Sequence, residues 1–176
     1  MASSISANAV MGIGKPKAVP AISNATILGE VVWLLSYSQL HRDWPIGSIQ
    51  QWIVPALLHN QFRIYRRAGK PKGFVSWAWM SKSVEEAYVL DTSSLRPVDW
   101  KSGERFWIID FVAPFGDAKD IARDLKHKVF PDGVGRYLRV KPGSDTMHIR
   151  YIHGANAVAK SKDPNHNPAV ILPSSH

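Results

Sequence analysis

One carboxylate of the sequence stands in a strongly apolar segment, where a charge needs a specific partner. The segment RFWIIDFV (105–112) has the composition of a central β-strand, and strict alternation would place Phe106, Ile108, Asp110 and Val112 on one face. Burying an unpaired charge there would cost several kcal/mol, so Asp110 requires an imidazole, an arginine or backbone N–H groups. A structural ion pair or a capped turn would meet this need as well as a catalytic site would.

The candidate imidazole is His41, which lies in the polar segment SQLHRDWP (38–45). A histidine oriented by a buried aspartate is the usual arrangement when a ring nitrogen must accept a proton or attack a carbonyl near neutral pH. His41 and Asp110 are 69 residues apart in the chain, which neither supports nor excludes a contact. An exposed loop position, or an interaction with the carbonyl end of the preceding helix, is the alternative for His41.

A basic strip follows the motif APFGD on a predicted helix. It consists of Lys119, Arg123, Lys126 and Lys128, which lie away from the apolar stripe of that helix. A solvated face is the commoner explanation of such a strip. The functional alternative is contact with an anion, and the N-terminus of the same helix would favour a phosphate.

These residues must be positioned by one compact unit of about 130 residues. Apolar periodicity predicts four helices, which run from Asn24 or Thr26 to about Ser38 and over 46–60, 83–90 and 121–130. The second should begin at a capping box of Ser48 and Gln51 and kink at Pro55. The fourth should follow a start box of Asp117 and Asp120. Alternation and turn residues predict strands at 62–66, 73–79, 105–112, 137–140 and 147–152, the last two joined by the turn PGSD. This order predicts an α/β (α+β) domain with a mixed sheet and flanking helices.

The two ends of the chain lack a sustained period. We therefore predict a flexible N-terminal tail over 1–24, a folded domain over 25–154 and a flexible C-terminal tail over 155–176. The N-terminus lacks the charge order of a secretory signal, and Glu30 interrupts the apolar run ILGEVVWLL. We expect a cytoplasmic protein without an integral membrane segment.

Composition and missing motifs exclude several classes of site and favour an anionic partner. The 22 Lys plus Arg residues exceed the 14 Asp plus Glu residues, which gives a formal net charge of +8 and favours an anionic partner. The absence of cysteine excludes disulfides, thiolate metal sites and a cysteine nucleophile. The sequence has no Walker loop, GxGxxG motif, zinc-finger spacing or RNP-like strand, so we predict neither a bound metal nor nucleic acid as a partner.

An ordered set of motifs resembles the RTX toxin-activating lysine acyltransferases, the family of the haemolysin-activating protein. The motifs are LHRDWP after a helix ending VVWLLSYSQ, SWA (76–78), SGER (102–105), APFGD (113–117) and LRV (138–140). The likeness runs from about Leu28 to His153.

The resemblance implies a fold related to the Gcn5-type N-acetyltransferases and a fatty acyl transfer from acyl-acyl carrier protein to internal lysines of an RTX protoxin. The family's catalytic pair falls on His41 and Asp110, and a family serine near the site falls on Ser38. His41 would either deprotonate the lysine or carry the acyl group itself, and Asp110 would orient His41 or hold the lysine ammonium. Family members can form dimers, so the resemblance leaves both a monomer and a homodimer open, and an acidic carrier protein would suit Lys119, Arg123 and Lys126.

Two departures from the family pattern and two rival functions accompany this hypothesis. A family cysteine before SWA is Val75 here, and a family asparagine corresponds to Trp52, which would affect the acyl pocket or oligomer contacts. The rivals are a coenzyme A-dependent N-acyltransferase, which APFGDAKD supports poorly with its one glycine, and a non-catalytic basic binding module.

Overall fold

The computed structural model describes residues 23–140, 146–157 and 171–173. Within these ranges the chain forms one six-stranded mixed sheet in the order β1-β2-β3-β4-β5-β6. The strands are β1 (Phe62–Arg67), β2 (Lys70–Met80), β3 (Arg105–Val112), β4 (Val134–Val140), β5 (Thr146–His153) and β6 (Ile171–Pro173). Neighbouring strands are antiparallel except β3 and β4, which are parallel. The predicted mixed sheet is confirmed, and it is consistent with a Gcn5-type N-acetyltransferase fold.

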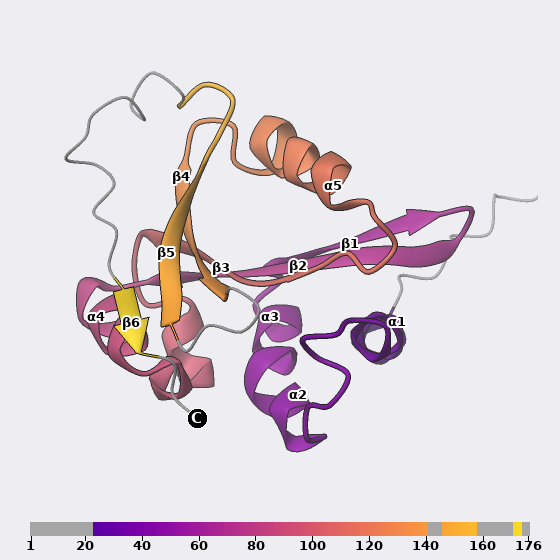
Figure 1. Cartoon of the computed structure of the whole chain (residues 1–176), viewed down its shortest axis with the longest axis horizontal. Coiled ribbons are helices and arrows are strands. Elements are labelled where there is room, and N and C mark those ends of the chain that lie inside the picture. The colour runs from indigo at the N-terminus through magenta and orange to yellow at the C-terminus, as the bar shows by residue number, and fades with distance from the viewer. Residues whose placement is uncertain (1–22, 141–145, 158–170, 174–176) are drawn as a thin grey trace, which may run out of the picture.

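Helices cover both faces of the sheet (Figure 1). On one face of β1–β3 lie α1 (Asn24–Ser36), α2 (Gly47–Trp52), α3 (Val54–Leu58) and α4 (Lys82–Leu90), and on the other lies α5 (Ala118–Asp124). Two short 3-10 helices, η1 (Thr92–Ser94) and η2 (Pro97–Trp100), follow α4, and a π-helical turn, η3 (Leu125–Val129), extends α5. Among the described residues, no helix has the length and apolar character needed to cross a bilayer.

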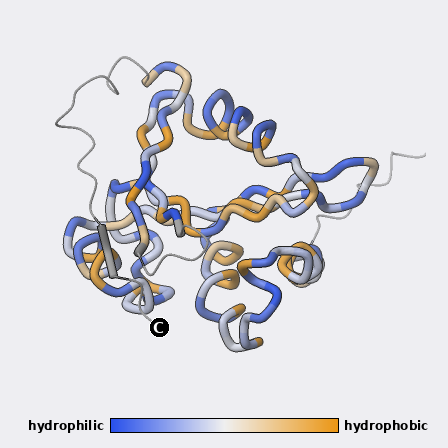
Figure 2. The backbone as a smooth tube through the Cα atoms, in the orientation of Figure 1, coloured by the Kyte–Doolittle hydropathy of each residue, from blue (hydrophilic) through white to orange (hydrophobic). Residues whose placement is uncertain are grey.

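The core consists of apolar side chains on both faces of β2 and β3, and hydrophobic residues accordingly follow these strands in Figure 2. On the first face, Leu34 of α1 packs against Phe74 and Val112, and Trp107 packs beneath α3 and α4. On the second face, Ile121 of α5 packs against Val75. Burial of each such side chain contributes roughly 1.5–3 kcal/mol, so these contacts fix both helical layers on the sheet.

The hairpin of β1 and β2 is tighter than the sequence indicated. Arg67 pairs with Lys70, which leaves only Ala68 and Gly69 in the turn. Both turn residues have positive φ angles, 48° and 78°, as a two-residue hairpin of the I′ kind requires. Glycine adopts this conformation without strain, and Ala68 is held in it by the strands on either side.

The first helix is confirmed, but its predicted N-cap is wrong. Ser23, not Asn24 or Thr26, caps α1, because its hydroxyl accepts a hydrogen bond from the Thr26 N–H at 3.1 Å. α1 ends at Ser36.

The predicted second helix is divided into α2 and α3 at Ile53. Pro55 lies in the first turn of α3, where its missing N–H costs nothing, so it starts a new helix instead of kinking one. The predicted capping box is wrong as well, since no side chain caps α2 and Gln51 donates to the Ser93 carbonyl at 3.3 Å.

The start of α5 differs from the predicted box in the same way. Asp117 occupies the N-cap position without a capping hydrogen bond. Its buried carboxylate instead forms ion pairs with Arg67 and with Lys72, the latter at 3.1 Å. These contacts attach the β3–α5 connection to the β1–β2 hairpin.

The parallel pair of β3 and β4 is short. Its register extends only from Trp107↔Arg136 to Ile108↔Tyr137, so the C-terminal halves of the two strands are unpaired with each other. The last predicted hairpin is confirmed by the antiparallel pairing of β4 with β5, while its PGSD turn falls outside the described residues. Within the predicted C-terminal tail, residues 171–173 form β6, and the remaining tail residues from 158 onward are not described.

Candidate active site

His41 is held in a tight turn directly after α1. The N–H groups of His41 and Arg42 both donate to the Ser38 carbonyl, at 3.0 and 2.9 Å. This turn places the Ser38 hydroxyl 2.6 Å from Nδ1 of His41. Trp44 packs edge-on against the imidazole with a ring-centroid distance of 4.6 Å, and the histidine is only 5% exposed. The alternative of an exposed loop histidine is therefore excluded, and the local sequence SxxH holds the ring in place.

Asp110 reaches the same side of the sheet through a β-bulge. Val75 pairs with Phe111 and Trp77 pairs with Ile108, so the single residue Ser76 lies opposite two residues of β3, Ile109 and Asp110. An extra residue in one strand interrupts strict alternation.

The bulge corrects the predicted face of β3. Phe106 and Ile108 pack with α5, whereas Val112 packs with α1, so these residues do not share a face as expected. Asp110 belongs with Val112 on the α1 face, where its carboxylate contacts the Ser76 side chain and His41.

His41 and Asp110 form a buried pair. Nε2 of His41 lies 3.4 Å from Oδ1 of Asp110, with side-chain exposures of 4% and 5%. The other carboxylate oxygen, Oδ2, accepts a hydrogen bond from the Ser76 hydroxyl at 3.3 Å. Asp110 thus has the imidazole partner that its burial required.

The position of the proton on the His41 ring follows from the group that faces each ring nitrogen. A carboxylate only accepts hydrogen bonds, so the nitrogen facing Asp110, Nε2, carries the ring proton. With the ring proton on Nε2, Nδ1 is the acceptor for the Ser38 hydroxyl. The site therefore contains a hydroxyl, an imidazole and a carboxylate in series, and the Ser38 hydroxyl is hydrogen-bonded to Nδ1 of His41.

Two further residues near the pair escaped the sequence analysis. Ser76 is fully buried, and Tyr88 of α4 is buried with its ring edge-on to Trp107 at 5.3 Å. Burial, and secondarily the charge of Asp110, raises the pKa of the Tyr88 phenol, which therefore stays protonated near neutral pH. Ser76 could have been found as the one polar residue among Phe74, Ala78 and Met80 on the inward face of β2. Nothing in the sequence places Tyr88 near Asp110.

The basic strip is not brought together with the pair. Lys119 and Arg123 are exposed on α5 and Lys126 on η3, across the sheet from α1. Arg123 forms an exposed ion pair with Asp120 at 3.1 Å, and Lys128 pairs with Asp124 at 3.3 Å. Any role of the strip therefore concerns docking and not bond chemistry.

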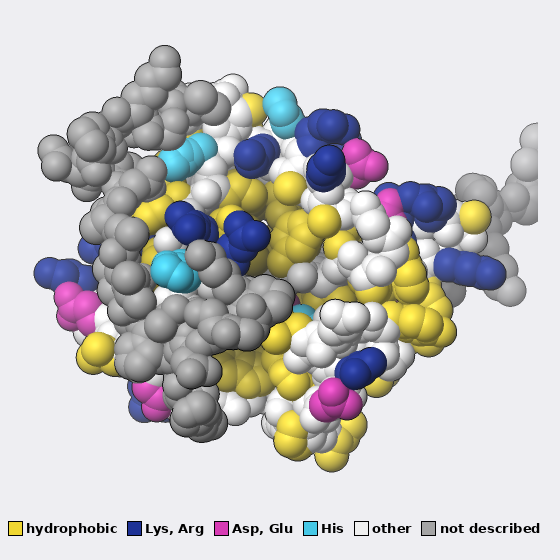
Figure 3. Space-filling model, viewed as in Figure 1, with side chains coloured by type: hydrophobic (Ala, Val, Ile, Leu, Met, Phe, Trp, Pro, Cys, Tyr) yellow, Lys and Arg dark blue, Asp and Glu magenta, His cyan; other side chains and the backbone are white. Residues whose placement is uncertain are grey.

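An exposed aromatic cluster adjoins the end of α1. Trp33, Tyr37 and Phe115 have ring centroids 4.8–5.5 Å apart, and each is at least 41% exposed. The space-filling view shows apolar side chains at the surface beside α1 (Figure 3). The elements that carry the pair therefore also present apolar surface.

The two positions that depart from the family pattern, Val75 and Trp52, lie on different sides of the sheet. Val75 packs in the cluster beneath α5, away from the α1 face on which the neighbouring Ser76 contacts Asp110. Trp52, at the end of α2, is partly buried and packs against the apolar clusters beneath both α1 and α4.

The chain is similar to known acyltransferases over most of its length. Residues 21–153 match the model of the RTX toxin acyltransferase family. The protein-lysine myristoyltransferase RtxC of Kingella kingae is 38% identical over 133 residues, which cover 76% of this chain and 79% of the relative. The RTX-III toxin-activating lysine-acyltransferase ApxIIC of Actinobacillus pleuropneumoniae is 42% identical over 129 residues, covering 73% and 74%. The protein-lysine myristoyltransferase HlyC of Escherichia coli is 39% identical over 128 residues, covering 73% and 75%.

Proposed function

The chain belongs to the RTX toxin acyltransferase family and is an acyltransferase, and from this premise we propose that it transfers a fatty acyl chain to the ε-amino group of internal lysines of an RTX protoxin. The acyl donor in this proposal is acyl-acyl carrier protein. The observation that carries the proposal is the buried His41–Asp110 pair within the matched segment. Relatives that are named protein-lysine myristoyltransferases support the acceptor and the acyl class.

The reaction needs a base, because a lysine with a pKa near 10.4 is almost wholly protonated at pH 7 and its ammonium cannot attack. In the proposed step the deprotonated amine attacks the thioester carbonyl, the C–N bond forms and the C–S bond breaks. Nitrogen loses two protons in all: the ammonium proton passes through His41 to solvent, and the proton lost as the C–N bond forms passes to His41 and then to the departing thiolate. The products are an amide, the free thiol and one proton released to solvent, so no further reactant is required.

Geometry favours His41 as a base over His41 as the acyl carrier. The ring is almost completely buried, and its two nitrogens face Ser38 and Asp110. A nucleophilic nitrogen must approach the carbonyl carbon directly, whereas a proton can travel through a hydroxyl. We therefore assign Ser38, which is less buried than His41, as the relay between the substrate amine and Nδ1.

Asp110 acts through the imidazole in this scheme. Its carboxylate faces the protonated Nε2, which keeps Nδ1 free to accept a proton. When His41 becomes positively charged, the adjacent carboxylate stabilises that charge, and their attraction is stronger than between two exposed groups because both are buried.

The proposed partners are an acyl carrier protein, an RTX protoxin and a second copy of the chain. The exposed cations Lys119, Arg123 and Lys126 suit an acidic carrier. The aromatic cluster of Trp33, Tyr37 and Phe115 offers apolar surface for a homodimer, which the family resemblance leaves open. The proposed location is the cytoplasm, because the proposed carrier is a cytoplasmic protein.

The test is acylation of a co-encoded protoxin. Incubation with acyl-acyl carrier protein should add the mass of one fatty acid, less one water, to a protoxin lysine, as measured by peptide mass spectrometry. His41→Ala should abolish this addition. His59→Ala is the matched control, because His59 contacts the Pro97 carbonyl at 3.3 Å and lies outside the catalytic pair. Full transfer by His41→Ala would refute the mechanism, and faster turnover with acyl-coenzyme A would refute the proposed donor.

A further inference from the structure

Ser76 is a fully buried hydroxyl whose two hydrogen bonds both involve Asp110. It lies in the middle of β2 with no exposed surface. Its Oγ accepts a hydrogen bond from the Asp110 N–H at 3.2 Å and donates one to Asp110 Oδ2 at 3.3 Å. The proposed proton transfers use His41 and Ser38, so they leave Ser76 without a direct part.

The position of Ser76 coincides with the bulge. A bulge disrupts the regular ladder at one residue, and a buried N–H that loses its acceptor is costly. The Ser76 hydroxyl supplies an acceptor to the N–H of the residue that carries the carboxylate. The same hydroxyl therefore supports the backbone and the side chain of Asp110.

Fixing one oxygen of a carboxylate determines where the other one points. Ser76 contacts Oδ2, and the remaining oxygen, Oδ1, is the one that lies 3.4 Å from Nε2 of His41. Without the hydroxyl, rotation about the Cβ–Cγ bond would be restrained on one side only. The imidazole would then lose the constraint that keeps its proton on Nε2.

We propose that Ser76 is a positioning residue for acyl transfer, which holds the bulged Asp110 so that its carboxylate orients His41. This proposal rests on the proposed function for its kinetic consequence, but its structural consequence can be measured without turnover. Ser76 acts through Asp110 and touches neither substrate nor His41 in this scheme. A purely structural role, in which Ser76 only completes the bulge, makes different predictions.

The kinetic test is Ser76→Ala. We expect kcat to fall by about ten- to a hundredfold, because a small misplacement of a catalytic group has effects of this size. KM for donor and protoxin should change less than about twofold, since Ser76 has no exposed surface with which to bind either. Ser76→Cys keeps the volume and offers only a weak donor, so it should show a loss in the same direction without leaving a cavity.

A double-mutant cycle separates positioning from structure. In the Asp110→Asn background, Ser76→Ala should lower kcat by less than about twofold more, because the carboxylate that it orients is already gone. Independent, multiplicative losses would overturn the proposal.

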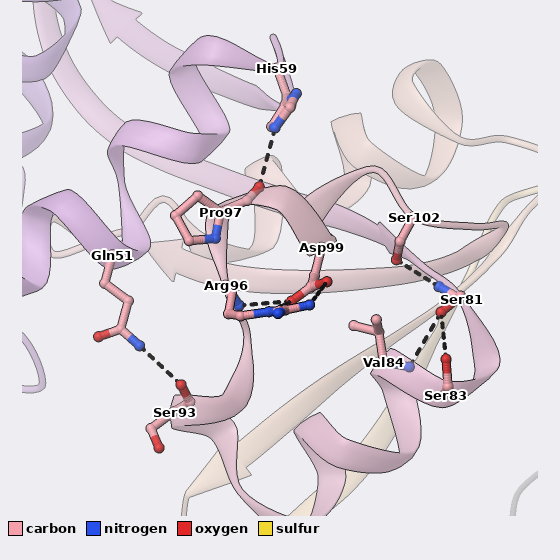
Figure 4. Close-up of polar contacts among 10 residues, drawn as sticks. All are labelled: Gln51, His59, Ser81, Ser83, Val84, Ser93, Arg96, Pro97, Asp99 and Ser102. Carbon is pink, nitrogen blue, oxygen red and sulfur yellow. Dashed lines mark hydrogen bonds and ion pairs between the residues drawn. The ribbon is translucent and has the colours of Figure 1, made fainter.

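The matched control is Ser81→Ala, one residue beyond β2. Ser81 caps α4 by accepting from the Val84 N–H at 3.3 Å (Figure 4), and the hydrogen bonds of its side chain and N–H go to Ser83, Val84 and Ser102 and not to Asp110. We expect this variant to lower the Tm without lowering kcat. If Ser76→Ala reduces kcat no more than Ser81→Ala does, Ser76 does not position the pair.

The imidazole NMR signals of His41 provide the readout that is independent of activity. Ser76→Ala should shift the ¹⁵N resonances of the ring toward a mixture of tautomers, while Ser81→Ala should leave them unchanged. An unaltered ring spectrum in Ser76→Ala would overturn the proposal even if the protein transferred no acyl group. Conversely, active wild type and inactive His41→Ala, together with normal Ser76→Ala, would refute this inference alone.

Discussion

At the scale of single residues, the site combines one local contact with one remote contact. Ser38 and His41 are three residues apart and meet within one turn, whereas Asp110 comes from a central strand. The local contact determines which nitrogen of the ring receives a proton. The remote contact determines which nitrogen already holds one.

Removal of the Ser38 hydroxyl tests the proposed relay. Ser38→Ala should lower kcat by about 10²-fold, at the lower end of the range for general acid–base contributions, because Nδ1 of His41 loses its hydroxyl partner. Ser36→Ala is the control, since the Ser36 hydroxyl donates only to the Trp33 carbonyl of its own helix. Comparable kcat values for the two variants in single-turnover acylation would contradict the relay.

At the scale of elements, the parallel pairing of β3 and β4 depends on a close approach of backbone to side chain. Gly135 of β4 faces the buried ring of Phe106, and a Cβ atom there would lie 2.4 Å from Phe106 Cδ1 and 3.0 Å from Ile152 Cγ2. Phe106 also stacks against Phe130 at 4.6 Å, so the ring has little room to move. A side chain at this position would separate the two strands.

Gly135→Ala should therefore lower the free energy of unfolding by about 1–3 kcal/mol, as overpacking of a core does. The measurement is urea denaturation followed by circular dichroism. Gly29→Ala is the control, because a Cβ there meets nothing within 4 Å and alanine favours α1 by up to about 1 kcal/mol. Equal stabilities of Gly135→Ala and wild type would show that the ring can give way.

The element scale also shows what sequence reasoning can and cannot predict. Strand 105–112 and the helix before His41 were recognisable because their apolar patterns are local. The bulge was not, since it arises from the register between β3 and Ser76 of another strand, and it reversed the face expected for Phe106 and Ile108. The break at Ile53 was similarly hidden, because Pro55 suits both a kink and a new helix start.

The site itself was predicted by a different route. Burial argued that Asp110 needs a partner, but only the family resemblance selected His41 among seven histidines. Ser76 stands in the SWA motif and in an otherwise apolar face of β2, but its contact with Asp110 depends on the register of β2 and β3. The position of Tyr88 near Asp110 depends on the packing of α4, which no motif encodes.

At the scale of the whole molecule, the basic strip and the proposed catalytic pair lie on opposite faces of the sheet. The pair lies on the α1 face of the sheet, while Lys119, Arg123 and Lys126 lie along α5 and η3 on the other. A carrier protein bound at the strip would therefore dock on the face opposite the buried pair and would not perturb the electrostatics of that pair.

Reversal of Lys119, Arg123 and Lys126 to glutamate should raise KM for acyl-acyl carrier protein and leave kcat nearly unchanged. The rise should be largest at low salt, where charges are least screened. Reversal of the exposed Lys82 and Lys101, near α4 at the other end of β2, is the control. An unchanged KM at low salt would exclude the strip as the docking face.

The separation of the catalytic pair along the chain also has a consequence for how the protein is made. His41 and Asp110 are 69 residues apart, and closing a loop of that length costs entropy that the packing of α1 and its neighbouring helices on the sheet must offset. A nascent or partly folded chain therefore lacks the oriented imidazole on which the proposed transfer depends.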